Sequence, residues 1–136
     1  LIFNASAGLP IFRRLFLSVF SVFLLYSSPA CAGEVPVPGR VTMVDIGAGT
    51  CIPCKMMAPV IEKVKGLYEG RAEIVFIDMR KDREAPEKFG ISAIPTQIFH
   101  DGSGRERSRH VGFLDEAGIR KILDTLLSEA DGASAR

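Results

Sequence analysis

The stretch GAGTCIPCKMMAP, from Gly47 to Pro59, places two cysteines two residues apart, directly before an apolar helical pattern. A pair at this spacing suits three kinds of site: a redox-active dithiol, half of a metal site or a structural staple. A disulfide between Cys51 and Cys54 would close only a very short loop and constrain little chain entropy. The structural staple is therefore the weakest of the three interpretations.

A metal site would need two further ligands, usually a second pair at matching spacing. The other candidate ligands are His100 and His110, which stand singly far along the chain. We therefore predict no metal site. We expect both histidines on the surface of a hairpin, with His110 near the edge of the cysteine site.

Residues 1–32 differ in composition from the rest of the chain, because they contain two arginines and no acidic residue. The arginines precede a 12-residue apolar run, Leu15 to Tyr26, and then an A-x-A pattern at Ala30–Ala32. This order is typical of a secretory signal peptide, and the run is shorter than the roughly 20 residues that span a membrane. An uncleaved membrane anchor is the main alternative. Lipid attachment at Cys31 and a twin-arginine signal are less favoured.

Export would change the charge and the cysteine content of the chain. Removing residues 1–32 takes away Cys31 and two basic residues, which leaves 15 basic residues against 16 acidic ones, a net charge of −1 instead of +1. Neither value gives a reason to expect a nucleic-acid partner. With 136 residues, the chain has room for one domain plus processing segments. The expected organisation is a signal peptide over 1–32, a Pro/Gly-rich leader over 33–40, a folded domain over 41–130 and a tail over 131–136.

Beyond residue 40, strand and helix patterns alternate along the chain. Short β-branched, apolar runs predict buried strands, and apolar residues spaced by three and four predict helices with one buried face. The predicted strands cover 41–46, 73–79, 96–100 and 105–111, and the predicted helices run from about 53 to 68, from 84 to 89 and from 115 to about 132. Pro59 should kink the first helix. This order predicts an α/β sheet covered on both faces, with the polar last strand at an edge.

These patterns make the chain similar to the thioredoxin family over about Val41–Leu127. CIPCKMMAP follows the family's C-x-P-C-K pattern and includes its downstream proline, Pro59. Asp45 stands where thioredoxins keep a buried carboxylate, and FGISAIPT resembles the segment that holds the family's cis-proline, here Pro95. Gly112 matches a family glycine beside the active site.

The resemblance implies a thioredoxin-like α/β fold of reduced size. We expect a minimal four-stranded mixed sheet flanked by about three helices, with the family's opening strand and helix reduced or absent, because only residues 33–40 separate the signal peptide from the first strand. Two other positions depart from the family. Thr50 replaces an aromatic residue before the first cysteine, which predicts a smaller and more polar rim, and Ile74 is the expected replacement for the lysine that neighbours the buried carboxylate.

The cysteine positions predict an asymmetric pair. Cys51 lies at the start of a helix, where unpaired N–H groups and the helix dipole favour a thiolate, so its pKa should lie below the free value of about 8.5. Cys54 lies one helical turn inward and should be more buried. Cys51 would attack a substrate disulfide, and Cys54 would resolve the mixed disulfide. Asp45 is the expected proton acceptor for Cys54, through water, because burial should raise its pKa.

The resemblance also places a substrate groove beside the cysteines. Ile94, which precedes the cis-proline Pro95, would present its backbone N–H and C=O to an extended substrate segment. Thr50 and Gly112 would complete the substrate-binding positions. The supporting residues are Pro53, which is preorganised for the first helical turn, Lys55 and Pro59.

Together these inferences predict an exported thiol–disulfide oxidoreductase that reduces disulfides of extracytoplasmic proteins. Ile52 and Pro53, between the cysteines, offer no charge to stabilise the reduced thiolate, whereas a histidine there would make a stronger oxidant. No cofactor is expected beyond the Cys51–Cys54 disulfide. The expected partners are exported disulfide-containing proteins and a membrane electron donor. The membrane would be contacted only through an uncleaved N-terminal segment.

We expect a monomer, located in the periplasm if the host is a Gram-negative bacterium. Two alternatives stay open. One is a disulfide oxidase or isomerase of exported proteins, which a measured reduction potential would separate from a reductase. The other is a non-catalytic thioredoxin-like binding module or redox sensor.

Overall fold

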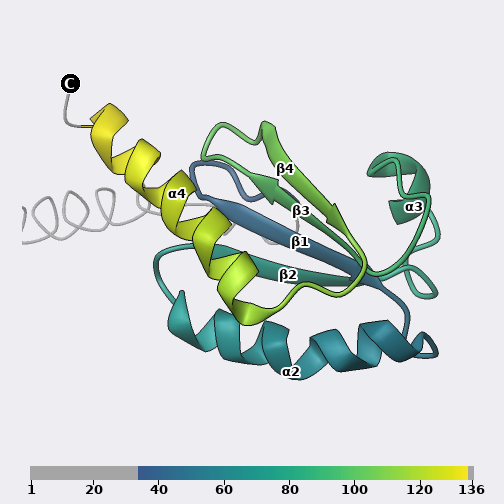
Figure 1. The fold of residues 1–136 in the computed structure, drawn as a ribbon. Coiled ribbons are helices and arrows are strands. Elements are labelled where there is room, and N and C mark those ends of the chain that lie inside the picture. The colour runs from purple at the N-terminus through teal and green to yellow at the C-terminus, as the bar shows by residue number, and fades with distance from the viewer. Residues whose placement is uncertain (1–33, 135–136) are drawn as a thin grey trace, which may run out of the picture. The chain divides into compact units, whose positions relative to one another are not determined.

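The computed structural model describes residues 34–134, and the predicted signal peptide, residues 1–32, lies outside this part of the chain. Within residues 34–134, no helix combines the length and the apolar character that crossing a membrane requires. The elements follow one another in the order expected from the sequence (Figure 1). They are β1 (Thr42–Gly47), α2 (Ile52–Leu67), β2 (Glu73–Asp78), α3 (Ala85–Lys88), β3 (Thr96–His100), β4 (Glu106–Val111) and α4 (Glu116–Ser134).

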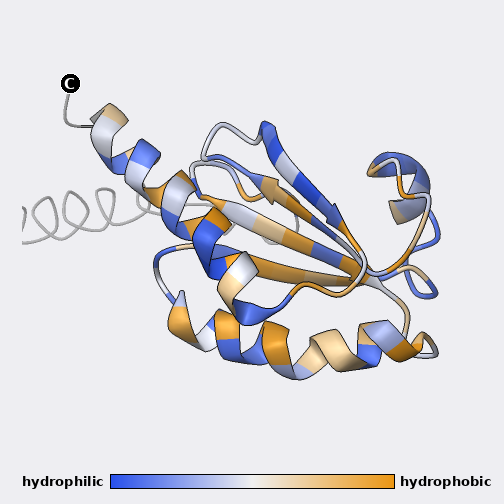
Figure 2. Cartoon of the chain, in the orientation of Figure 1, coloured by the Kyte–Doolittle hydropathy of each residue, from blue (hydrophilic) through white to orange (hydrophobic). Residues whose placement is uncertain are grey.

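The strands form one mixed sheet in the order β2-β1-β3-β4. β1 pairs in parallel with β2, because α2 carries the chain back along the sheet between them. β1 and β3 are antiparallel, as are β3 and β4, which a short turn connects. For the described residues, the prediction of a four-stranded mixed sheet with three helices is confirmed. The polar strand β4 lies at an edge, and the other three strands carry nearly all of the apolar residues (Figure 2).

The larger part of the core lies between the sheet and the helices α2 and α4, which cover the same face (Figure 1). Met43 of β1 and Phe99 of β3 are fully buried there against Met57 of α2 and Ile119 and Leu123 of α4. Each side chain of this size contributes about 1.5–3 kcal/mol when it is removed from water. These contacts hold α2, and with it the cysteine pair, against the sheet.

The opposite face of the sheet has a smaller core. Val44, Ile46 and Ile98 point to this face and pack with Ala85 of α3 and with Phe89, which follows α3. Alternation along β1 explains the division, because successive side chains of a strand point to opposite faces. Asp45 lies between Val44 and Ile46 in the sequence and therefore points to the α2 face.

The described part of the leader, residues 34–40, contacts the folded domain. The N–H of Gly39 donates to the carbonyl oxygen of Gly102, in the turn between β3 and β4, at 3.0 Å. The N–H of Val37 donates to Oγ1 of Thr42 at 3.1 Å, and Val35 packs against the smaller core. Gly39 has a φ of +77°, a conformation that glycine adopts without steric cost. The chain thus enters the sheet through an ordered turn.

The last helix is longer than predicted. α4 continues through Gly132 to Ser134, whereas the sequence pattern suggested an end by Gly132. That prediction was wrong because one glycine in a helix interior costs only about 1 kcal/mol relative to alanine, which does not by itself end a helix. Residues 131–134, expected to belong to a tail, are helical.

Candidate active site

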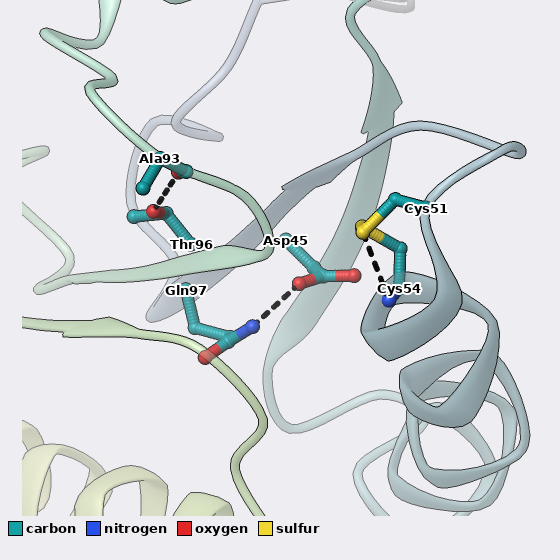
Figure 3. The surroundings of a disulfide bond; sticks show 6 residues. All are labelled: Asp45, Cys51, Cys54, Ala93, Thr96 and Gln97. Carbon is teal, nitrogen blue, oxygen red and sulfur yellow. Dashed lines mark hydrogen bonds between the residues drawn. A yellow bond between two sulfur atoms is a disulfide. The ribbon is translucent and has the colours of Figure 1, made fainter.

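Cys51 and Cys54 form a disulfide at the start of α2, with their Cα atoms 5.2 Å apart (Figure 3). Cys51 is the N-cap residue of the helix, and its Sγ accepts a hydrogen bond from the backbone N–H of Cys54 at 3.3 Å. Pro53 lies in the first turn, where its missing N–H leaves no helical hydrogen bond unmade. Cys54 is buried, with 7% of its surface exposed, whereas Cys51 is half-buried. The two sulfurs therefore occupy unequal surroundings.

This inequality favours a thiolate at Cys51 once the disulfide is reduced. The N–H of Cys54 already points at Sγ of Cys51, and the positive end of the helix dipole lies at the same place. The N–H group and the helix dipole both stabilise a negative charge on Sγ of Cys51. The sulfur of Cys54 lies inside the helix turn and away from solvent, which disfavours its ionised form.

Asp45 is a buried carboxyl group on the α2 face of β1, with 1% of its surface exposed. Nε2 of Gln97 donates a hydrogen bond to Oδ1 of Asp45 at 2.9 Å. Figure 3 shows Asp45 between Gln97 and the cysteine pair, with its second carboxyl oxygen turned toward the cysteine side. Burial raises the pKa of Asp45, and the hydrogen bond from Gln97 offsets part of that increase. The site thus contains a carboxyl group that is able to bind a proton at a higher pH than an ordinary aspartate.

Asp45 belongs to a row of side chains that crosses the whole sheet. Strand pairing places Phe76 of β2 beside Asp45, Asp45 beside Gln97 of β3, and Gln97 beside His110 of β4. Ile74, the expected replacement for the family's lysine, pairs with Met43, two residues earlier in β1. The direct strand partner of Asp45 on β2 is the aromatic Phe76.

A pocket of about 240 Å³ opens beside this row. Its lining includes Asp45, Cys54 and Phe76, together with Lys55 and Glu62 of α2. Most of the lining is apolar, and the two charged side chains are exposed at the surface of α2. The pocket gives water a path to the carboxyl group and to the inner cysteine.

The loop before β3 provides the second part of the candidate site. The Ile94–Pro95 peptide bond is cis. Oγ1 of Thr96 donates to the carbonyl oxygen of Ala93 at 2.7 Å, which closes the loop around the proline (Figure 3). The N–H of Gly112 donates to the carbonyl oxygen of Pro95 at 2.8 Å, so these two predicted residues lie side by side.

Exposed apolar side chains follow Cys51 along the chain and flank Gly112. Ile52 and Met56 of α2 are 73% and 56% exposed, and Val111 and Phe113, on either side of Gly112, are 52% and 43% exposed. We refer to these four exposed residues as the apolar rim, two from α2 and two from the chain beside Gly112.

The other predicted site residues, Thr50, Lys55 and Pro59, are exposed. Thr50 is exposed in the turn before Cys51, and Pro59 lies exposed in the middle of α2, which continues through it as one helix. Lys55 is exposed and lines the pocket. Sequence reasoning missed Gln97 and Phe76. The signal for Gln97 was a glutamine inside the short apolar strand TQIFH. Phe76 lies in the apolar run EIVFID and gave no signal of its own, because its exposure is evident only in the structure.

The structure offers no metal centre within residues 34–134, where no three potential ligands among His, Cys, Asp and Glu come together. The expectation that His100 lies on the surface was wrong, because it is only 6% exposed. Its strand, β3, is an inner strand with neighbours on both sides. Burial lowers the pKa of His100, and the nearby Glu106 carboxylate opposes that effect. His110 is half-buried, with Nε2 3.2 Å from the carbonyl oxygen of Phe113, which follows Gly112.

Comparison with known proteins gives a consistent result. The thioredoxin family model matches residues 33–125. Thioredoxins from Staphylococcus haemolyticus and Staphylococcus epidermidis are 39% and 38% identical over 89 residues, which is 65% of this chain and 84% of each relative.

Solved structures show the same likeness. The thioredoxin of Fasciola hepatica is 29% identical, with a TM-score of 0.59 over 65% of this chain and 83% of that one. A mutant thioredoxin from Halobacterium salinarum has a TM-score of 0.60 over 65% of this chain and 76% of that one. At 24% identity, this second structure supports the fold alone.

Proposed function

Because the chain belongs to the thioredoxin family and is a thiol–disulfide oxidoreductase with the Cys51–Cys54 pair, we propose that it reduces disulfides of exported proteins outside the cytoplasm. The observation that carries the chemistry is the unequal placement of the two sulfurs. One caps a helix near the surface, and the other is buried one turn further on. Such a pair suits an exchange in which the outer sulfur meets the substrate and the inner sulfur completes the reaction.

The exchange proceeds in two balanced steps. The Cys51 thiolate attacks one sulfur of a substrate disulfide, forms a mixed disulfide and releases the other substrate sulfur as a thiolate, which takes up a proton. Cys54 then gives its proton to the carboxylate of Asp45 through pocket water, attacks Sγ of Cys51 and expels the second substrate thiolate, which is protonated in turn. Two electrons pass from the dithiol to the substrate, and the Cys51–Cys54 disulfide remains.

Substrate binding uses the loop at Pro95 and the apolar rim of Ile52, Met56, Val111 and Phe113. The backbone N–H and C=O of Ile94 are placed next to the proline, where an extended segment of a substrate could pair with them. Gly112 leaves space on the other side of Pro95, because it has no side chain. The rim would contact apolar residues that flank the substrate disulfide.

Two features support the direction and the location. Ile52 and Pro53, between the cysteines, carry no charge that would stabilise the reduced form and make the protein a strong oxidant. Residues 1–32 have the composition of an export signal or an uncleaved anchor. A reductase in that location needs electrons from the other side of the membrane, so we propose a membrane protein with its own reactive dithiol as the donor.

The reduction potential tests the proposed direction. We expect a midpoint near about −270 mV in equilibrium with glutathione or dithiothreitol, whereas a value near about −120 mV would identify an oxidant instead. The same measurement on Ile52→His should give a higher potential, since an added cation stabilises the thiolate. A wild-type potential at the oxidising end would refute the reductase proposal.

Trapping identifies the partners. Cys54→Ser keeps the attacking sulfur but cannot complete the reaction, so it should accumulate mixed disulfides with exported proteins and with the electron donor. Cys51→Ser is the matched control, because it lacks the attacking sulfur and should trap none.

A fusion tests the location, because alkaline phosphatase fused after residue 136 should be active only if the chain is exported. Captured partners that are all cytoplasmic, together with an inactive fusion, would contradict the proposed location.

A further inference from the structure

Phe76 is the one side chain of the sheet-crossing row that is both large and half exposed, at 50%. Its strand position is directly beside Asp45. A methyl group added at Gly47 would lie 3.2 Å from Sγ of Cys54 and 3.3 Å from Cε2 of the Phe76 ring. The ring, the buried sulfur and the bare backbone of Gly47 therefore border the same small space.

The same ring forms a wall of the pocket that reaches Asp45 and Cys54. The pocket volume of about 240 Å³ corresponds to on the order of eight water molecules. The ionisable groups around it are Asp45 from β1 and Cys54, Lys55 and Glu62 from α2. β2 contributes only the uncharged Phe76, and β3 contributes the uncharged Gln97 through its hydrogen bond to Asp45. The aromatic ring thus forms one wall beside a reactive sulfur and its proton acceptor without adding a charge.

We propose that Phe76 is a positioning residue for the second step of the exchange, in which Cys54 loses its proton and attacks Cys51. The ring confines the water between Cys54 and Asp45 to the pocket, so that the proton passes to this carboxylate and not to the bulk. It also keeps the carboxyl group in a poorly solvated place, where the protonated form is favoured after the transfer. This inference rests on the proposed role of Asp45 as proton acceptor.

Gly47 completes the arrangement. Any larger residue at position 47 would enter the space between the ring and Sγ of Cys54, since even a methyl group comes within 3.3 Å of both side chains. The ring could then no longer line the pocket in its present position. The position of the Phe76 ring therefore requires glycine at position 47, and we expect Gly47→Leu to reproduce the effects of removing the ring.

An exposed phenylalanine on an edge strand has a simpler explanation, in which it contacts substrates or has no role. The two explanations differ in the step that they affect. A substrate contact would alter the first step, the attack of Cys51 on the substrate. A positioning residue would alter the pKa of Asp45 and the pH dependence of the second step while the first stays unchanged.

The test compares Phe76→Ala, Phe76→Lys and Phe76→Met in the reduced protein. ¹³C NMR follows the titration of the Asp45 carboxyl group. Stopped-flow absorbance follows 5,5′-dithiobis(2-nitrobenzoate), which releases one thiolate when Cys51 attacks and a second when Cys54 resolves the adduct. Leu67→Lys is the matched control, because Leu67 is 49% exposed at the far end of α2 and gains the same charge.

We expect Phe76→Ala to lower the pKa of Asp45, because bulk water then solvates the carboxylate. Phe76→Lys should lower it by about 1–3 units, as an adjacent cation does. The pH midpoint of the second release should shift in the same direction, the first release should not change, and Phe76→Met should behave as the wild type. An unchanged Asp45 titration in Phe76→Ala overturns the proposal, and so does an altered first release with an unaltered second.

Asp45→Asn distinguishes a failure of the positioning role of Phe76 from a failure of the proton-acceptor role of Asp45. If Asp45→Asn leaves the second release at its normal rate, the proton-acceptor role of Asp45 is refuted. If Asp45→Asn slows the second release but Phe76→Ala behaves as the wild type, only the role of Phe76 is refuted.

Discussion

Gln97 and Asp45 share a hydrogen bond of 2.9 Å across two neighbouring strands, and both side chains are buried. The bond favours the ionised carboxylate and so acts against burial, which raises the pKa of Asp45. We predict that Gln97→Leu raises this pKa above its value in the wild type. ¹³C NMR titration of the carboxyl group measures the change.

The control for this substitution is Thr42→Val, which also removes a buried polar group but lies at the far end of β1 on the opposite face. It should leave the Asp45 titration in place. A Gln97→Leu protein with the wild-type pKa would mean that the hydrogen bond does not influence the carboxyl group.

Asp45→Asn should stabilise the fold at neutral pH. Asparagine keeps the acceptor for Gln97 but carries no charge to bury. Since burial raises the pKa of Asp45 above 3.8 in the folded protein, the folded state holds its proton more tightly than the unfolded chain. The wild type therefore loses stability as the pH rises from the unfolded value to the folded one, by about 1.4 kcal/mol for each unit between them, and the cost remains at higher pH.

Urea unfolding of both oxidised proteins, from acidic to neutral pH, measures this difference in the free energy of unfolding. The advantage of Asp45→Asn should be small near the unfolded pKa and should grow as the pH rises. Equal stabilities at neutral pH would show that the carboxylate is buried without cost.

Cys51 should be the more acidic thiol of the reduced protein. In Cys54→Ala, which leaves Cys51 as the titrating member of the pair, we expect a pKa below the free value of about 8.5, because the cap N–H groups and the helix dipole stabilise the thiolate. Absorbance at 240 nm reports thiolate formation. The same variant in concentrated urea is the reference, and identical titrations in the two states would exclude any contribution from the helix.

His100 should make the fold sensitive to mild acid. Burial lowers the pKa of this histidine below 6.5, and Glu106 opposes the effect only in part. The unfolded chain therefore takes up a proton before the folded one does. Stability is complete above the unfolded pKa and falls as the pH decreases through it toward the folded value. Nδ1 of His100 has no hydrogen-bond partner within the part of the chain that the structure describes, so protonation gains no contact there.

His100→Gln should remove this loss of stability between neutral and mildly acidic pH, as measured by chemical unfolding at a series of pH values. His110→Gln, at the chain's other histidine, is the matched control and should keep the wild-type dependence. If both variants lose stability with acid as the wild type does, another group is responsible.

The order of elements and the redox pair could be predicted from the sequence, because both depend on local patterns. Spacing by three and four marks α2, and the cysteines lie at its first turn whatever the rest of the chain does. Strand register is different. β1 and β2 are joined through a whole helix, so nothing local determines that Asp45 meets Phe76 and not Ile74. That difference of two residues decided what stands beside the carboxyl group.

Burial of polar residues in β3 was also beyond local patterns. His100 was expected on the surface of a hairpin, and no role was predicted for Gln97 from the sequence. The position of β3 between β1 and β4, with a core on each face, buries both. A polar residue in an inner strand then needs a partner, and Gln97 finds one in Asp45, whose role depends on this contact.

The turn at Gly39 also decides how the molecule can be attached to a surface. It contacts the β3–β4 turn beside the first residue of β1, while the cysteines follow the last residue of the same strand. The six residues of β1, at about 3.3 Å each, separate these two ends. A bead or an electrode coupled ahead of Glu34 would therefore hold the protein by the end that carries no chemistry and leave the sulfurs open to the solution.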